Sequence, residues 1–247
     1  MAAAFLAVLP ALTPPASDGE AAANTESAPA VPAFAATGDR RDIITRGDLR
    51  GRVDLRPLRG VPHVYALGPV AGLKGEVTIY DGTPAVATLD GAGAVVVDAS
   101  PAALNREAIF LARGKVANWR AVPVPRVLSG LAAVEAFVRD AAAAAGRSLD
   151  APFLFRVEGT ADVEYHVIWK TGGAPHDKAE HKRSKRPFVA RRAAVKIVGA
   201  WADEAGEGVY THPGKRTHLH FLSADGTHSG HVDGITLAAG ATLFLPE

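Results

Sequence analysis

The sequence contains no cysteine, a single methionine and few aromatic residues, and its charges almost cancel. The absence of cysteine excludes disulfides and thiolate metal sites, which leaves histidine and carboxylate side chains as the only strong metal ligands. The formal net charge of +1 supplies no field that would attract nucleic acid or an anionic membrane. We therefore expect no nucleic acid and no membrane among the partners of this chain.

Basic residues are absent from the first part of the chain, where no Lys or Arg precedes Arg40. Residues 2–12 form an apolar run of signal-peptide length that is too short to span a bilayer. The segment that follows is rich in Ala, Pro, Ser and Thr, a composition typical of a disordered linker. Residues 1–38 are therefore predicted to be a signal-like leader and linker of a secreted or periplasmic protein. The alternative is a cytoplasmic protein with an unstructured leader.

Most apolar segments of the remaining chain are short and are separated by turn signals such as Asp81-Gly82 and Asp90-Gly91, which favours strands joined by tight turns. One segment, SGLAAVEAFVRDAAAAAG, instead carries apolar residues at helical spacing. It predicts a helix over residues 129–145 with Ser129 as its N-cap.

These patterns predict an α+β fold that is β-rich, with two sub-domains of mostly antiparallel or mixed sheets and one main helix between them. Residues 39–150, including the helix, would form the N-terminal sub-domain. Residues 151–247 would form a C-terminal β sub-domain that binds a metal.

The metal prediction comes from the segment RTHLHFLSADGTHSGHV, which holds four of the nine histidines. Residues two apart on a strand share a face, so His218 and His220 point the same way, roughly 7 Å apart. A tight turn at Asp225-Gly226 would place His220 directly opposite His231 on the returning strand. Three imidazoles on one face, without a fourth protein ligand, are typical of a catalytic metal with an open coordination position.

The same register sends His228 to the other face, away from the metal, whereas the direction of His212 is not fixed by spacing. Neutral imidazole suits zinc and also iron, nickel or copper, so the expected cofactor is Zn²⁺ or another divalent transition metal. The alternative interpretation is a polar strand face that binds nothing.

Other polar residues interrupt apolar strands or form a charged loop. Glu76 begins the segment EVTIYDG, and Arg156 lies within FLFRVEG, where a cation is costly unless it meets an anion. Either residue could be a structural ion-pair partner instead of a functional one. The basic segment 170–192 is predicted to be a solvated loop, although His176, Glu180 and His181 could form a second metal or acid–base cluster in it.

Three blocks of the sequence resemble, in order and spacing, those of the α-acetolactate decarboxylase family. They are YALGPVAGLKGEVTIYDG, FLFRVEG and THLHFLSADGTHSGHV, and the resemblance extends over about residues 63–246. The resemblance implies a two-domain β-rich fold with zinc held by His218, His220 and His231. It also implies that Glu76 and Arg156 are active-site residues.

The family's reaction converts α-acetolactate, a 2-hydroxy-3-oxo acid, into acetoin and carbon dioxide. A metal can serve as the electron sink for the departing carboxylate, Arg156 can hold that carboxylate, and Glu76 can act in proton transfer. Family members usually add a second carboxylate from a C-terminal tail, for which Glu247 is the only candidate here. The expected partner is a small keto or hydroxy acid, and the chain could form a homodimer.

Two other function classes stay open. A cupin-like metal enzyme also uses an H-x-H pair and a later histidine, but it would add a Glu where this chain has Asp225 in the predicted turn. An exported family-related protein could bind a metal and act on, or only bind, another small keto or hydroxy acid.

Overall fold

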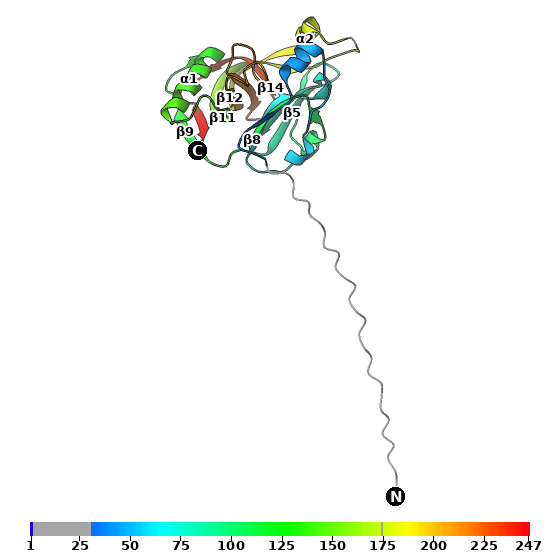
Figure 1. Ribbon diagram of the computed structural model, residues 1–247, viewed down its shortest axis with the longest axis horizontal. Coiled ribbons are helices and arrows are strands. Elements are labelled where there is room, and N and C mark those ends of the chain that lie inside the picture. Colours follow the sequence, from blue (N-terminus) through cyan, green and yellow to red (C-terminus); the bar gives the residue numbers. More distant parts are fainter. Residues whose placement is uncertain (2–30, 174) are drawn as a thin grey trace.

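The computed structural model describes Met1, residues 31–173 and residues 175–247, and it shows two large sheets lying against each other (Figure 1). The α+β, β-rich fold class is confirmed. The first sheet has six strands. In spatial order they are β1 Ala35–Thr37, β8 Leu111–Lys115, β3 Val64–Pro69, β4 Glu76–Tyr80, β5 Thr83–Leu89 and β6 Val95–Asp98.

The second sheet has seven strands and closes on itself, because β14 pairs with both β13 and β11. In spatial order its strands are β10 Leu128–Ser129, β14 Ser229–Leu237, β13 Thr217–Ser223, β12 Lys185–Trp201, β11 Phe153–Ile168, β15 Thr242–Pro246 and β9 Trp119–Pro123. A small third sheet pairs β2 Val53–Asp54 with β7 Glu107–Ala108.

Two α-helices accompany the sheets, and they lie well apart in the molecule (Figure 1). Helix α1 spans Leu131–Ala144 and α2 spans Lys178–Ser184. A π-helical turn covers Asp42–Arg46, and short 3-10 turns cover Arg56–Leu58, Ala71–Leu73 and Pro101–Leu104. None of the helices within the described residues is long and apolar enough to span a membrane.

The side-chain alternation of β11 explains how the two large sheets meet. Phe155 and Val157 point into the closed second sheet, whereas Leu154 and Ile168 point outward to pack with residues of the first sheet such as Leu67. Every apolar residue of this outer face is therefore buried in a layer between the sheets. His166 lies on this outer face too and is buried in the layer, whereas Thr160 and Glu164 of the same face are exposed.

The interior of the second sheet is tightly filled where β11 and β12 pair. Gly199 lies opposite Phe155, and a Cβ added to Gly199 would come within 2.2 Å of the Phe155 ring. We expect Gly199→Ala to destabilise the protein by about 1–3 kcal/mol, because overpacking forces the ring out of its rotamer. Chemical denaturation measures this loss. Gly91→Ala, where an added Cβ meets nothing within 4 Å, is the matched control, and an equal loss in both variants would contradict the packing argument.

The predicted leader and linker are partly corrected. Residues 2–30, which include the signal-like run, lie outside the described residues. Within the predicted linker, Ala35–Thr37 form β1, which pairs with Leu111–Arg113 at the edge of the first sheet. Alanines carry little strand preference of their own, so the open edge of β8 rather than local sequence determines this strand.

Two further predictions, the start of the helix and the loop over residues 170–192, differ from the structure. Ser129 is not the N-cap of α1, because it belongs to β10 and pairs with Thr236, and Gly130 takes the N-cap position without a side-chain cap. The predicted loop 170–192 contains α2, capped by the Asp177 side chain, and the first part of β12. Pairing with β11 outweighs the basic composition of that part of β12.

The chain passes from the first sheet to the second between Lys115 and Trp119. Helix α1 consequently packs on the second sheet through Val134 and Val138, although the sequence grouped it with the N-terminal part. The division into sub-domains at residue 150 stays a prediction.

Candidate metal centre

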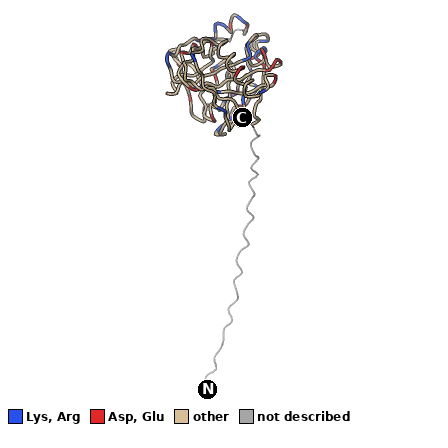
Figure 2. Tube along the Cα trace, turned by 90° about the vertical axis from the view of Figure 1, so that its left-hand side faces the viewer, with Lys and Arg blue, Asp and Glu red and all other residues tan. Residues whose placement is uncertain are grey.

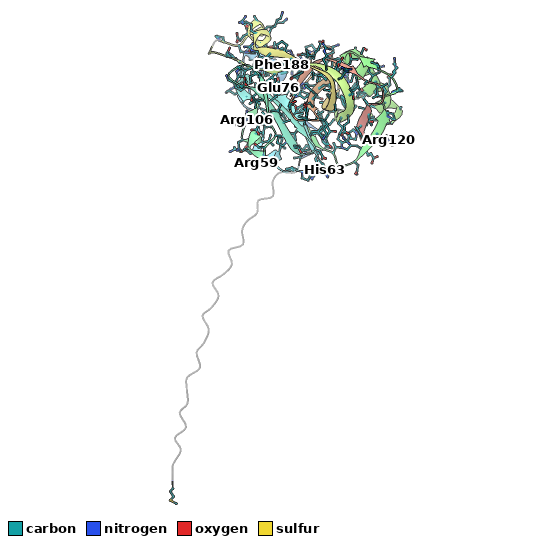
Figure 3. The ribbon with its side chains drawn as sticks, turned by 180° about the vertical axis from the view of Figure 1, so that it is seen from behind. Arg59, His63, Glu76, Arg106, Arg120 and Phe188 are labelled. Carbon is teal, nitrogen blue, oxygen red and sulfur yellow. The ribbon has the colours of Figure 1, made fainter. Side chains whose placement is uncertain are left out.

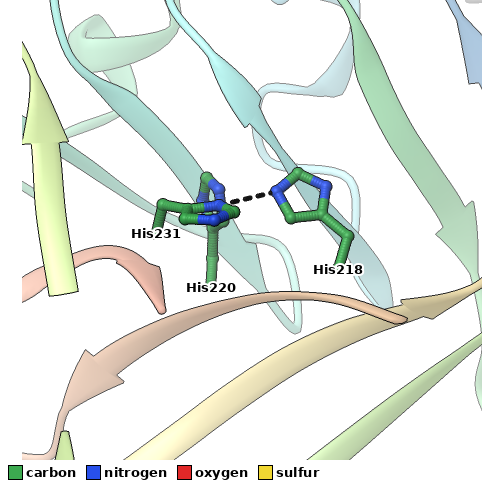
Figure 4. A group of neighbouring side chains, drawn as sticks. All are labelled: His218, His220 and His231. Atoms are coloured by element: carbon green, nitrogen blue, oxygen red, sulfur yellow. Dashed lines mark hydrogen bonds between the residues drawn. The ribbon is translucent and has the colours of Figure 1, made fainter. Parts of the chain in front are cut away.

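The three histidines selected by the hairpin rule meet in the layer between the two sheets (Figure 4). One ring nitrogen from each of His218, His220 and His231 lies within 4.8 Å of the other two. The Nε2 atom of His218 is 3.0 Å from Nδ1 of His231, the contact drawn as a dashed line in Figure 4. All three side chains are buried, and His220 is fully so. The arrangement can hold a metal ion.

The hairpin itself has the predicted register with a different loop. His220 pairs with His231 across β13 and β14. Ser223 N–H donates to the His228 carbonyl, so four residues, 224–227, form the loop between this pair. Within it the Gly226 N–H donates to the Ser223 carbonyl, and Gly226 takes the left-handed φ of 72°. A four-residue loop centred on the same two positions gives the same pairing as the two-residue turn, so the facing histidines are unaffected.

The hydrogen bonds around His220 test whether the residues suit a metal. Its Nδ1–H donates to the Val77 carbonyl at 2.9 Å, which fixes the ring and leaves Nε2 as the unprotonated atom. That Nε2 is fully buried and has no hydrogen-bond partner. A buried nitrogen lone pair without a partner is costly, and a metal ion would satisfy it. The residues present therefore fit a metal ion.

Burial also keeps these imidazoles neutral, as metal ligands must be. It lowers the pKa of His220 to about 3 and moves the pKa values of His218 and His231 well below the usual range of histidine. A charge on His220 would also disfavour the protonation of His218, and charges on His218 and His220 would disfavour the protonation of His231.

Glu76 faces the same cluster from the first sheet. Figure 3 labels Glu76 at the first sheet. As the first residue of β4 it shares a face with Thr78 and Tyr80, the face that packs on the second sheet. Its Oε2 lies 3.7 Å from His220 Nε2, and its Oε1 accepts a hydrogen bond from Ile168 N–H. Burial raises the pKa of Glu76 to about 8. The structure thus brings together Glu76 and the predicted histidine triad.

The structure adds residues that the sequence did not single out. His166 of β11 pairs directly with His231 of β14, and its Nε2 is 3.7 Å from Glu76 Oε1. Its Nδ1 is 2.6 Å from Asp233, the residue left unpaired where the β11–β14 register shifts. His166, His231 and Asp233 form a second group whose ligand atoms lie close enough to hold a metal.

His212, whose direction the sequence left open, places Nε2 3.3 Å from His231 Nε2. His228 points elsewhere, as predicted, and contacts the Tyr165 hydroxyl at 2.9 Å. Asp225 stays in the turn, bonded to Ser223 and Thr227, so it does not supply the carboxylate that a cupin-like site would add.

A cavity of about 40 Å³ opens next to the histidines. Its volume suits a small molecule, since one water needs roughly 10–15 Å³ on this measure. The polar or ionisable residues that line it are Arg40, Glu76, His166, His181, Lys185, Tyr210, Thr211, His212, His218 and His231.

Arg156 does not reach this cavity, which corrects its predicted role as holder of a substrate carboxylate. Its guanidinium pairs with Glu158, donates to the Tyr80 hydroxyl at 2.6 Å and stacks on the Phe244 ring. Tyr80 lies four residues from Glu76 along β4, a separation of about 13 Å. Arg156 thus meets its anion within its own strand and serves the packing between the sheets.

Glu247 does not line the cavity beside the histidines. It follows β15 and lines two other pockets with Arg147 and Pro246, so it does not supply a second carboxylate to the cavity. In the predicted second cluster, His176 and His181 do touch, at 3.2 Å. Glu180 pairs with Arg183 instead, and only His181 of the three lines the cavity.

Solved structures with the same fold include α-acetolactate decarboxylases. The enzyme from Bacillus subtilis strain 168 matches with a TM-score of 0.69 and 15% identity, over 87% of this chain and 85% of that one. The enzyme from Bacillus subtilis subspecies spizizenii gives a TM-score of 0.69 and 15% identity, over 87% and 86% of the two chains. A Staphylococcus aureus protein of unknown function, described as similar to this decarboxylase, gives 0.68 and 14%, over 87% and 85%.

No family model matches the sequence, and no curated protein sequence does. The likeness therefore rests on the structure, where it extends over most of both chains. The chain has the fold of the α-acetolactate decarboxylases.

Proposed function

We propose that this chain is a divergent α-acetolactate decarboxylase that uses Zn²⁺, or another divalent transition metal, to convert α-acetolactate into acetoin and carbon dioxide. The observation that carries the proposal is the buried triad of His218, His220 and His231 beside a small cavity, with the unpartnered Nε2 of His220 among its ligand atoms. The shared fold supports the reaction class.

The reaction needs one bond broken and one proton delivered. Loss of carbon dioxide breaks the bond between C1 and C2 of the substrate and leaves its electron pair on C2, conjugated with the C3 ketone. A bound metal would supply the positive charge that accepts this electron density. Glu76 lines the cavity and is the carboxyl group placed to deliver a proton to C2, which yields acetoin. The Ile168 N–H holds the Glu76 carboxyl through Oε1, and His166, held by Asp233, lies 3.7 Å from the same oxygen.

The runner-up is a metal-binding relative that acts on, or only binds, another small keto or hydroxy acid. It is favoured by one observation: neither Arg156 nor Glu247 lines the cavity, so Glu76 is the one carboxyl group among the described residues that line it. Secretion or export to the periplasm is likewise proposed, from the composition of residues 1–38.

Metal removal tests the decarboxylase directly. We expect purified protein to form acetoin from α-acetolactate, to lose that activity on dialysis against a chelator, and to regain it when one equivalent of Zn²⁺, Co²⁺ or Mn²⁺ is added. A colorimetric acetoin assay with elemental analysis of the same samples measures both quantities. Bound metal with no acetoin would reject the decarboxylase and leave the runner-up.

A further inference from the structure

The cavity beside the metal centre carries an unbalanced positive charge. Among the described residues that line it, the cations are Arg40 and Lys185, and the only acid is Glu76. Lys185 has an anionic partner outside the lining, since its Nζ lies 3.5 Å from Asp233. Glu76 is directed at His166 and His220. Arg40 alone is left without a carboxylate.

Arg40 makes no ion pair with any of the residues that the structure describes, although the arginines around it do. Arg41 pairs with Asp39, and Arg46 and Arg52 pair with Asp42. Arg40 is only partly exposed, and burial lowers the pKa of its guanidinium. Guanidinium stays charged in proteins, so a half-buried one without an anion is a costly arrangement that a bound anion would relieve.

The backbone holds Arg40 at this position. The chain leaves the edge strand β1 through Gly38, whose φ is 83° and which packs so closely on Phe110 that no other residue fits. The Arg40 N–H then donates to the Val209 carbonyl at 2.7 Å. Arg40 lines the same cavity as His212 and His218, which places it beside the proposed metal centre.

We propose that Arg40 is the carboxylate-binding residue of this cavity and selects small 2-hydroxy or 2-keto acids as ligands of the metal centre. The inference rests on the proposed function for its substrate class. The planar guanidinium matches a carboxylate through two parallel hydrogen bonds, and the small volume excludes larger anions such as nucleotides. Arg40 thereby takes the role that the sequence suggested for Arg156.

Binding, measured without turnover, tests Arg40. The probes are 2-hydroxy-2-methylpropanoate and its neutral amide, titrated by calorimetry into zinc-loaded full-length protein. We expect the acid to bind more tightly than the amide. Arg40→Ala should lower the affinity for the acid by roughly 10- to 100-fold and leave the affinity for the amide unchanged. Arg40→Lys should fall between, because an ammonium cannot form the paired contact.

The matched control is Arg41→Ala, which removes the neighbouring exposed arginine and should leave both affinities unchanged. Unchanged acid affinity in Arg40→Ala, or an equal loss for acid and amide, would overturn the assignment. Tighter binding of inorganic phosphate than of the acid would overturn the ligand class. Because no turnover is measured, Arg40-dependent binding in a protein that forms no acetoin would reject the decarboxylase while supporting the role of Arg40.

Discussion

Replacing His220 by alanine is expected to abolish stoichiometric metal binding while the protein still folds. The ring is fully buried, and its Nε2 is the ligand atom that has no other partner. Loss of groups that only orient metal ligands costs roughly 10–100-fold in affinity, so loss of a ligand should exceed that range. Elemental analysis and competition with a chromophoric chelator measure the change. Acetoin formation should disappear in parallel.

His228→Ala is the matched control for this experiment. It removes a histidine from the same hairpin, but the side chain faces Tyr165 on the other side of the strand pair. Metal content and affinity should equal those of the wild type. If both variants lose the metal, the effect comes from hairpin destabilisation. If His220→Ala keeps full metal affinity, the triad is not the binding site.

The meeting of the three histidines could be predicted from sequence because every rule it needs is local. Strand alternation fixes His218 with His220, and a turn at Asp225-Gly226 fixes His220 opposite His231. The loop turned out longer than expected, yet the pairing depends only on where the loop is centred. The general α+β class followed in the same way from short strands and one helical segment.

His166 and Asp233 could not be found by local rules. Their meeting requires β11 to pair with β14, strands about 70 residues apart, and requires a register shift that leaves Asp233 unpaired. The alternation of side chains along β11 places His166 on the outer face of the strand, but it does not identify the residue of the neighbouring strand that lies opposite. The same limit applies to Arg40, which reaches the cavity because β1 fills an edge of the first sheet.

The Arg156 error has a specific physical origin. A cation in an apolar strand does need an anion, but the anion of Arg156 is Glu158, two residues further along the same face. Residues at i and i+2 of a strand are close enough to pair, so this partner was visible in the sequence. A ligand role should be inferred only after such neighbours are considered.

Glu76→Gln is expected to keep the metal and to lower turnover by roughly 10²–10⁴-fold, the usual contribution of a general acid. The amide conserves the volume of this buried side chain and can still accept the Ile168 N–H, so the site should stay assembled. What it lacks is the carboxyl proton that acetoin formation requires. The measurements are kcat for acetoin formation and metal content, taken on the same preparation.

Glu158→Gln provides the matched change at a carboxylate of β11, which binds Arg156 and also Tyr80 at the opposite end of β4 from Glu76. Its turnover should stay within about twofold of the wild type if Arg156 has no part in the reaction. If Glu76→Gln loses the metal, Glu76 is a metal ligand. If the metal-loaded Glu76→Gln protein keeps full turnover, Glu76 does not transfer the proton. Since these outcomes differ in metal content and in kcat, the pair of variants separates the metal-binding and proton-transfer roles of this carboxyl group.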